Sequence, residues 1–232
     1  MKLSIVIPVY NEKNTILEIL KKVESAELGN IEKEIIIVDD FSTDGTKDIL
    51  KGLYCHKYKI ILKDKNEGKG SAVKMGFLGA TGDIIIIQDA DLEYDPGDYK
   101  KILEPILRGR ADVVYGSRLL SGEAKRVLFI WHFLGNIFLT LLSDLFTGLT
   151  LTDMETGYKA LRKEVIDSFK NKLKSKRFGI EPELTARVAQ GQWRVYEIGI
   201  SYYGRDYSEG KKIKWKDGLV AIWHIVRFNL FK

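Results

Sequence analysis

Apolar residues in the first half of the chain gather in short continuous runs, and amphipathic stretches separate these runs. The runs at 3–8, 34–40 and 84–88 show no strict alternation and end at polar residues. Such runs are typical of strands buried on both faces. Between them, 12–26 carries apolar residues at helical spacing, and 70–79 is a second predicted helix. The pattern predicts an α/β fold: a Rossmann-like, mostly parallel sheet with helices on both faces.

Polar motifs follow the predicted strands. In a parallel sheet of this kind, ligands bind at the carboxyl ends of the strands. The motifs fall at 10–12, 39–40, 64–70, 89–91 and 116–118. The sequence therefore predicts a ligand-binding cleft along this edge of the sheet.

The second half of the chain has a different pattern. Residues 124–147 are strongly apolar over a helical length, yet polar side chains recur at every third or fourth position, which places them in one stripe. The stripe consists of His132, Asn136, Thr140, Ser143 and Thr147. The tail, 205–232, is basic, and 211–231 within it is predicted to form an aromatic-rich amphipathic helix. No run of about 18 uncharged apolar residues occurs, so we expect interface helices and no transmembrane helix.

The chain is modestly basic. Its net charge of +5 results from 37 Lys and Arg against 32 Asp and Glu, which favours anionic partners such as nucleotides or an anionic membrane. We expect no nucleic acid, because the basic residues are not interleaved with stacking aromatic side chains. Cys55 is the single cysteine and the three histidines are far apart. Neither a disulfide framework nor a zinc site is therefore expected, which fits a reducing cytoplasmic location.

Two carboxylates follow the apolar run at 84–88. In extended backbone, Asp89 and Asp91 face the same side, and they repel each other unless a cation compensates. Mg²⁺ commonly binds one or two carboxylates together with substrate phosphates. The motif predicts a metal-bridged diphosphate, and a solvated turn after a strand is the alternative.

Two further motifs suggest nucleotide contacts. Asp39 or Asp40, at the end of the second strand, is suited to accept hydrogen bonds from a ribose or a base, although helix capping by Ser42 or Asp44 is the alternative. In "NEGKGSA", the glycines allow a ligand to approach the backbone, and Lys69 at a helix N-terminus favours phosphate. An ordinary strand-to-helix turn is the alternative there.

These motifs occur in the order "IPVYNE", "VDDFSTDGT", "NEGKGSA", "QDADLEYDP", "YGSR". Over residues 1–118 the chain resembles the family 2 glycosyltransferases with the GT-A fold. The resemblance implies a nucleotide-sugar donor and Mg²⁺ or Mn²⁺. The implied nucleotide contacts are Pro8, Tyr10, Glu12, Asp39, Asp40, Lys69, Gly70, Asp89 and Ala90. The implied metal contacts are Asp89, Asp91 and Glu93, and the implied catalytic residues are Asp89, Asp91 and Arg118.

The second half resembles the dolichyl-phosphate mannose synthase branch, through "TDMETGYKAL", the apolar helix at 124–147 and "YYGRDYSEGKKIKWKDG". This implies transfer of a hexose from GDP-mannose or a UDP-hexose to a polyprenyl (dolichyl) phosphate, at the cytoplasmic face of a membrane. A phosphate acceptor is already anionic, so it needs cations rather than a strong base. The implied acceptor-phosphate contacts are Arg118, Arg126, His132, Asn136, Arg205 and Lys211. The implied acceptor loop contains Asp153, Thr156 and Gly157.

We predict one GT-A domain at 1–204, with a nucleotide-sugar half at 1–118 and an acceptor half at 119–204, followed by the tail at 205–232. Glu93 stands where many of these synthases have Gln, and His132 and Asn136 stand where Arg and Ser are usual. These departures leave the sugar open. The sequence also leaves open whether a small membrane subunit anchors the chain.

Three other functions were weighed. A sugar hydroxyl as acceptor requires a catalytic carboxylate, such as Glu183 or Asp153. If the chain were a non-catalytic membrane-binding module, membrane binding by the basic tail would be its main function. A sugar nucleotidyltransferase is disfavoured, because no glycine-rich phosphate loop follows the first strand.

Overall fold

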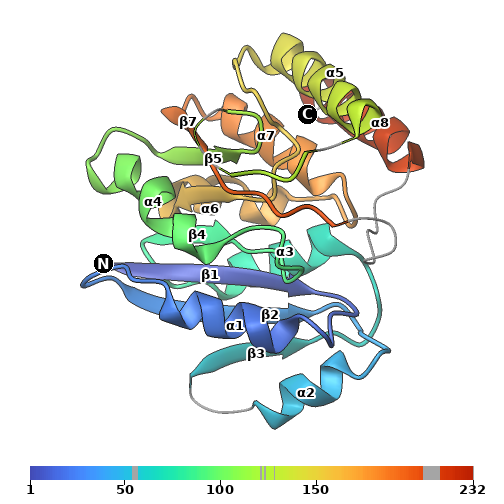
Figure 1. The fold of residues 1–232 in the computed structure, drawn as a ribbon. Coiled ribbons are helices and arrows are strands. Elements are labelled where there is room, and N and C mark those ends of the chain that lie inside the picture. Colours follow the sequence, from blue (N-terminus) through green and yellow to red (C-terminus); the bar gives the residue numbers. More distant parts are fainter. Residues whose placement is uncertain (54–56, 121, 123, 128, 206–214, 232) are drawn as a thin grey trace.

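The computed structural model describes residues 1–53, 57–120, 122, 124–127, 129–205 and 215–231, which form one sheet covered by helices (Figure 1). The strands are β1 (Lys2–Val9), β2 (Glu32–Asp39), β3 (Tyr58–Leu62), β4 (Ile84–Ile87), β5 (Val113–Ser117), β6 (Lys159–Arg162) and β7 (Val195–Gly199). The α-helices are α1 (Ile16–Ser25), α2 (Thr46–Gly52), α3 (Lys69–Gly79), α4 (Tyr99–Leu107), α5 (Ile130–Thr147), α6 (Lys163–Phe169), α7 (Ile180–Gln190) and α8 (Trp215–Leu230). Short 3₁₀ helices lie at Pro96–Asp98 and Lys170–Lys172.

The sheet has the strand order β3-β2-β1-β4-β6-β5-β7. The strands β3, β2, β1 and β4 pair in parallel, as do β5 and β7, whereas β6 is antiparallel to both β4 and β5. Because β6 enters between β4 and β5, the second half of the chain completes the sheet that the first half begins. This architecture confirms the predicted α/β, mostly parallel sheet.

The central strand β1 contributes to the core on both faces of the sheet. Its alternate side chains point to opposite faces, so Ile5 and Ile7 join one apolar cluster and Val6 joins the other. All three side chains are fully buried, and burying a side chain of this size contributes about 1.5–3 kcal/mol. The unbroken apolar runs in the sequence therefore reflect burial on both faces.

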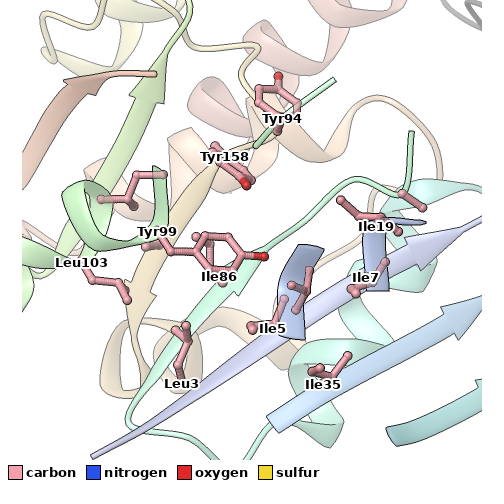
Figure 2. Packing of buried hydrophobic residues seen from close by; sticks show 14 of the residues in the cluster. Leu3, Ile5, Ile7, Ile19, Ile35, Ile86, Tyr94, Tyr99, Leu103 and Tyr158 are labelled. Atoms are coloured by element: carbon pink, nitrogen blue, oxygen red, sulfur yellow. The ribbon is translucent and has the colours of Figure 1, made fainter. Parts of the chain in front are cut away.

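A row of tyrosines connects the core to the polar edge of the sheet (Figure 2). Tyr94 and Tyr158 are stacked with their ring centroids 4.8 Å apart. The hydroxyls of Tyr99 and Tyr158 both donate to Gln88 Oε1, at 2.7 and 2.5 Å. Gln88 is fully buried directly before Asp89. These hydrogen bonds fix the end of β4, where the acidic motif begins.

The apolar helix predicted at 124–147 begins later than expected, at Ile130. Lys125 forms an isolated β-bridge with Tyr202, and the Arg126 N–H donates to the Tyr202 carbonyl at 2.8 Å. This extended pairing uses backbone groups that a helix would need for itself. The chain therefore turns helical only after it leaves the segment around Tyr202.

Helix α5 lies beside α8 at one end of the molecule (Figure 1). Its polar stripe faces the domain: Asn136 Nδ2 donates to Asp153 Oδ1 at 2.9 Å, and Thr140 Oγ1 accepts from the Met154 N–H at 3.1 Å. Ser143 is buried. The exposed face is apolar and presents Trp131, Leu134, Phe138, Leu141 and Leu145.

The polarity of α5 is thus the reverse of that of an ordinary surface helix, which turns its apolar side to the core. Leu145 is 83 % exposed and Trp131 is 79 % exposed. By length and composition α5 is the one described helix that qualifies as a membrane span, although none was expected from the sequence. Helix α8 extends the exposed apolar surface with Leu219, Val220, Trp223 and Leu230.

Candidate active site

The polar residues predicted to share a cleft do come together. Glu12 follows β1, Asp91 follows β4, and Arg205 from the segment after β7 contacts both carboxylates. Asp89 lies close to the "TDMETGYKAL" segment, because a Cβ atom on Gly157 would meet Asp89 Oδ2 at 2.3 Å. A side chain at position 157 would therefore force the Asp89 carboxylate to move where this segment crosses the end of β4.

Asp91 lies among several charged groups. Arg205 Nη2 lies 3.2 Å from Asp91 Oδ2 and 3.4 Å from Glu12 Oε1, and the Glu93 N–H donates to Asp91 Oδ1 at 3.2 Å. Burial and the neighbouring Asp89 and Glu93 raise the pKa of Asp91 to about 7, and Arg205 opposes that rise. The site is short of positive charge, which a divalent ion bound together with diphosphate oxygens would supply.

The carboxylates fit a metal that takes much of its coordination from substrate. No group of three or more His, Cys, Asp or Glu side chains among the described residues is arranged to hold a metal ion. Asp91, with Asp89 beside it, provides the one or two carboxylates that Mg²⁺ uses when phosphate oxygens and water complete its shell. The donor set therefore suits a metal that arrives with a diphosphate.

Glu93 fastens the segment after β7 to the end of β4. Its Oε2 accepts from the Tyr202 hydroxyl at 2.9 Å and its Oε1 accepts from the Arg205 N–H at 2.8 Å. The Tyr203 N–H donates to the Glu93 carbonyl at 2.9 Å. These bonds give Glu93 a structural task, and its role as a metal ligand stays a prediction.

Asp89 is paired with a lysine instead of standing free. Lys69 Nζ lies 2.8 Å from Asp89 Oδ1 and 2.9 Å from Glu181 Oε1. Burial lowers the pKa of Lys69, but the two carboxylates outweigh it and hold that pKa well above its usual value. Lys69 therefore stays charged at the position where a donor phosphate is expected. Glu181 was not expected as its partner from the sequence, because only the fold brings α3 and α7 together.

Asp39 and Asp40 differ in what remains available on each carboxylate. Asp40 pairs with Lys63 and accepts from the Glu67 and Gly68 N–H groups, at 3.0 and 2.6 Å, so both of its oxygens are used. Asp39 Oδ2 accepts from the Ser42 N–H at 3.1 Å, whereas its buried Oδ1 has no partner among the described residues. Asp39 is the better candidate for a nucleoside contact.

The glycines of "NEGKGSA" make room for another chain segment. A Cβ atom on Gly68 would lie 2.6 Å from the Lys176 carbonyl oxygen, and one on Gly70 would lie 2.4 Å from the Ser175 carbonyl oxygen. Gly68 also has a φ of +95°, which side chains disfavour. Packing against residues 175–177 accounts for both glycines, and contact of Gly70 with the nucleotide stays a prediction.

Arg118 forms a buried pair with the predicted acceptor loop. Its Nε and Nη2 lie 2.6 and 2.7 Å from the two oxygens of Asp153, and Asn136 Nδ2 donates to the same carboxylate. Its guanidinium also lies 5.3 Å from the centroid of the Tyr202 ring. Burial raises the pKa of Asp153, but Arg118 and Asn136 hold it below its usual value.

The other predicted acceptor contacts are distributed around this pair. Arg126 Nη1 donates to the Gly204 carbonyl at 2.9 Å, which ties it to the segment that carries Arg205. The His132 ring packs 6.3 Å from that of Phe129 at the start of α5. Lys211 lies outside the described residues. The remaining predicted site residues are Pro8 at the end of β1, exposed Tyr10, buried Ala90 and buried Thr156.

Both carboxylates named for a hydroxyl acceptor are already engaged. Glu183 is fully buried and accepts from the Lys174 and Ser175 N–H groups, at 3.0 and 2.7 Å. Asp153 is held by Arg118 and Asn136. A general base needs an available oxygen within reach of the acceptor, so neither of these two carboxylates is placed to serve as one.

Sequence analysis missed a second titratable pair in the "TDMETGYKAL" segment. Glu155 Oε1 is buried without a hydrogen-bond partner among the described residues, and burial and Glu181 raise the pKa of Glu155 to about 8. Lys159 is buried, and its Nζ donates to the carbonyls of Met154 and Thr156. Spacing along the chain gave no signal for this pair, because the fold alone buries it.

Solved structures share this fold over the whole chain. Glucosyl-3-phosphoglycerate synthase from Mycobacterium tuberculosis, solved with Mn²⁺, UDP and phosphoglyceric acid, has a TM-score of 0.74 at 19 % identity and covers 100 % of this chain and 79 % of its own. The same enzyme with Mg²⁺ and UDP has a TM-score of 0.71 at 19 % identity, over 98 % of this chain and 79 % of its own. The fold is that of the GT-A glycosyltransferases.

The chain belongs to glycosyl transferase family 2, whose sequence profile matches residues 4–169. It is 32 % identical to a dolichol-phosphate mannosyltransferase from Pyrococcus furiosus, over 98 % of this chain and 63 % of that protein. It is 26 % identical to a UDP-N-acetylglucosamine–dolichyl-phosphate N-acetylglucosaminyltransferase from Methanococcus voltae, over 98 % of this chain and 96 % of that protein. An undecaprenyl-phosphate mannosyltransferase from Micrococcus luteus is 27 % identical, over 99 % of this chain and 95 % of that protein.

Proposed function

We propose that this glycosyltransferase moves a hexose from a nucleoside-diphosphate sugar to a polyprenyl phosphate at a membrane surface. The main support for this proposal is that helix α5 has one face bound to the polar acceptor loop and one face that is apolar and exposed. Its polar face contacts the acceptor loop through Asn136 and Asp153, and its opposite face exposes apolar side chains such as Leu145. A lipid phosphate needs this combination, with a polar site for its head beside an apolar surface for its tail. The named relatives act on dolichyl and undecaprenyl phosphates.

The donor would lie across the ends of β1, β2 and β4. Asp39 has an unsatisfied buried oxygen for a ribose hydroxyl or a base N–H, and Lys69 carries a positive charge beside Asp89. Asp91 would hold Mg²⁺ or Mn²⁺, and the metal would neutralise the charge that develops on the leaving diphosphate. Structures with this fold have been solved with UDP and with each of these ions, and two of the named relatives are mannosyltransferases. GDP-mannose and a UDP-hexose are therefore both candidate donors.

The transfer would proceed with inversion. An oxygen of the acceptor phosphate forms a bond to the anomeric carbon, and the bond from that carbon to the diphosphate oxygen breaks with its electron pair. The phosphate needs no deprotonation by the protein, because it is already largely anionic near neutral pH. Arg205 lies in the short segment after β7, and the Arg126 side chain donates to the Gly204 carbonyl in the same segment; these two cations would hold the acceptor phosphate. Arg118, paired with Asp153, would shape the pocket beneath it.

The protein would act as a peripheral enzyme at the cytoplasmic face of the membrane. Helix α5 has the length of a spanning segment, yet its stripe of polar side chains is committed to the domain. A helix with one protein-bound face and one apolar face suits a position in the interface plane, with the apolar face in the lipid. The enzyme would then contact the membrane surface through α5 and would not need a separate small membrane subunit for this contact.

A donor panel tests the proposal. Purified protein with Mn²⁺ and a short polyprenyl phosphate is mixed separately with labelled GDP-mannose, UDP-glucose, UDP-galactose and UDP-acetamidosugars. We expect label to enter the organic phase for one donor, which identifies the sugar and the acceptor class together. If no donor labels lipid, but soluble sugar acceptors release nucleoside diphosphate, the lipid-phosphate proposal is wrong and a hydroxyl acceptor replaces it.

A further inference from the structure

A basic pocket lies where loop 65–67, segment 174–177 and α8 meet, and neither Asp89 nor Asp91 lines it. Its volume is about 480 Å³. Four cationic side chains line it: Lys65, Lys174, Lys176 and Arg177. Glu67 is the carboxylate in this lining. The pocket is therefore suited to an anion.

The positive charge of the pocket is only weakly compensated. Glu67 pairs with Lys65 and Lys176 at 3.5 Å each, and both lysines are largely exposed. Exposed pairs of this kind contribute little. Lys174 and Arg177 are exposed and have no carboxylate partner for their side chains within the described part of the chain. An anionic ligand would gain contact with charges that the protein leaves unpaired.

The backbone that carries these side chains is held firmly. Glu183, fully buried, accepts hydrogen bonds from the backbone N–H groups of Lys174 and Ser175. The Ser71 N–H donates to the Lys176 carbonyl at 3.1 Å, and Gly68 allows the segment to pack tightly on the loop. The cations are thus presented by a fixed segment, which lowers the entropic cost of gathering them around a ligand.

The rim of the pocket joins the exposed apolar surface. Val220 on α8 lines the pocket and is 45 % exposed. Leu219 and Trp223, on the same helix, are also exposed, and α8 packs beside α5. A molecule with an anionic head and an apolar tail would therefore fit with its head in the pocket and its tail along α8.

We propose that this basic pocket binds the phosphate headgroup of an anionic membrane phospholipid and so orients the enzyme on the bilayer. The inference rests on the proposed action at a membrane. It concerns a site separate from the acceptor contacts around Arg118 and Arg205. Cations beside an interfacial helix gain affinity for anionic lipid, and the fixed segment adds a defined position for one headgroup.

Vesicle flotation tests the pocket. Wild type is compared with the variant Lys174→Gln/Lys176→Gln/Arg177→Gln on phosphatidylcholine vesicles, with and without phosphatidylglycerol. We expect wild type to prefer the anionic vesicles and the variant to lose on the order of 100-fold in binding to them. The matched control Lys21→Gln/Lys22→Gln/Lys51→Gln removes the same charge from α1 and α2, at the opposite end of the molecule from α8 (Figure 1), and should keep the preference.

The possible failures are distinguishable. In one outcome wild type binds both kinds of vesicle equally, and in another the two variants lose vesicle binding equally. Either result would show that the pocket does not bind an anionic headgroup, and neither would affect the proposed transfer of sugar to lipid. If inorganic phosphate or glycerol phosphate protects wild type against thermal unfolding as well as the lipid does, through the same three residues, the pocket is a site for soluble anions and the lipid assignment is wrong. Absence of lipid labelling in the donor panel, with the anionic preference intact, would instead count against the proposed reaction.

Discussion

Arg205 Nη2 lies 3.2 Å from Asp91 Oδ2, so a guanidinium contacts the carboxylate that is expected to hold a metal. Arg205 comes from the segment after β7, far along the chain from Asp91, and it also reaches Glu12 at the end of β1. The segment is fastened by Glu93 through the Tyr202 hydroxyl and the Arg205 N–H. A metal at Asp91 must therefore share the carboxylate with Arg205 or displace it.

Replacing Asp91 tests its role in the reaction. Asp91→Asn removes the charge that a divalent ion needs, and we expect turnover to fall by roughly 100-fold or more even at saturating Mn²⁺. Initial rates across a Mn²⁺ titration measure this. Asp95→Asn is the control, because Asp95 lies in the same loop and accepts from the Gly97 N–H. Full activity of Asp91→Asn at high metal concentration would remove Asp91 from the mechanism.

Replacing Arg205 tests the competition with metal. Arg205→Gln removes a cation from three carboxylates, so we expect Mn²⁺ to bind roughly threefold to tenfold more tightly in the absence of acceptor. Turnover should fall, because the acceptor phosphate loses a cation. Mn²⁺ binding measured by electron paramagnetic resonance, beside initial rates, separates the two effects. Weaker Mn²⁺ binding in this variant would mean that Arg205 supports the metal site.

The buried pair of Arg118 and Asp153 should contribute more to the free energy of unfolding than the more exposed pair of Arg194 and Asp112. Arg118→Ala leaves the fully buried Asp153 without its main partner, and we expect a loss of about 3–5 kcal/mol in the free energy of unfolding. Arg194→Ala removes a similar two-bond contact with Asp112, but Arg194 is half exposed, and about 0–1 kcal/mol is expected. Urea denaturation of both variants gives the comparison. Equal losses would show that burial does not decide the effect.

Glu155 should make stability fall as the pH rises from about 4.5 to about 8. Burial and Glu181 raise its pKa from the usual 4.5 to about 8. The fold therefore favours the protonated acid, and this contribution to stability is complete below about pH 4.5, declines as the pH rises, and is lost above about pH 8. Glu155→Gln keeps the neutral form at every pH. Its melting temperature should match that of wild type near pH 4 and exceed it by a growing margin as the pH rises to about 8. The exposed Glu27→Gln is the control, and a constant difference across this range would contradict the assignment.

The apolar face of α5 should govern binding to neutral membranes. Leu141→Ser/Leu145→Ser removes two exposed leucines, and we expect at least about tenfold weaker binding to phosphatidylcholine vesicles. The control Leu17→Ser/Leu78→Ser changes two exposed leucines on α1 and α3. Thermal stability should stay unchanged in both, because these side chains are exposed. Similar vesicle binding by all three proteins would exclude α5 as the membrane contact.

The sequence predicted the parallel part of the sheet well, because β1, β2 and β4 contain the continuous apolar runs that mark strands buried on both faces. Residues 84–88 and the acidic motif after them fell where expected. The start of α5 was missed, because Lys125 and Arg126 pair with Tyr202, and that contact depends on the tertiary fold. The polar stripe of α5 was visible from helical periodicity alone.

Pairings within the site were less predictable than its residue types. Asp89 and Asp91 were recognisable as a motif, but their partners Lys69 and Arg205 depend on how α3 and the segment after β7 are placed. The tight packing of Gly68 was likewise invisible, since a glycine beside a lysine also suits a phosphate loop. Sequence spacing reports local geometry, and charge pairing across elements is decided by the fold.

The contact of Gly68 and Gly70 with residues 175–177 limits how this enzyme can be recombined with its relatives. A graft of the "NEGKGSA" loop alone would bring a new backbone against the unchanged carbonyl groups of Ser175 and Lys176. The "NEGKGSA" loop and residues 175–177 form one structural unit, although a long stretch of chain separates them. A chimaera intended to change the donor should therefore exchange both segments together.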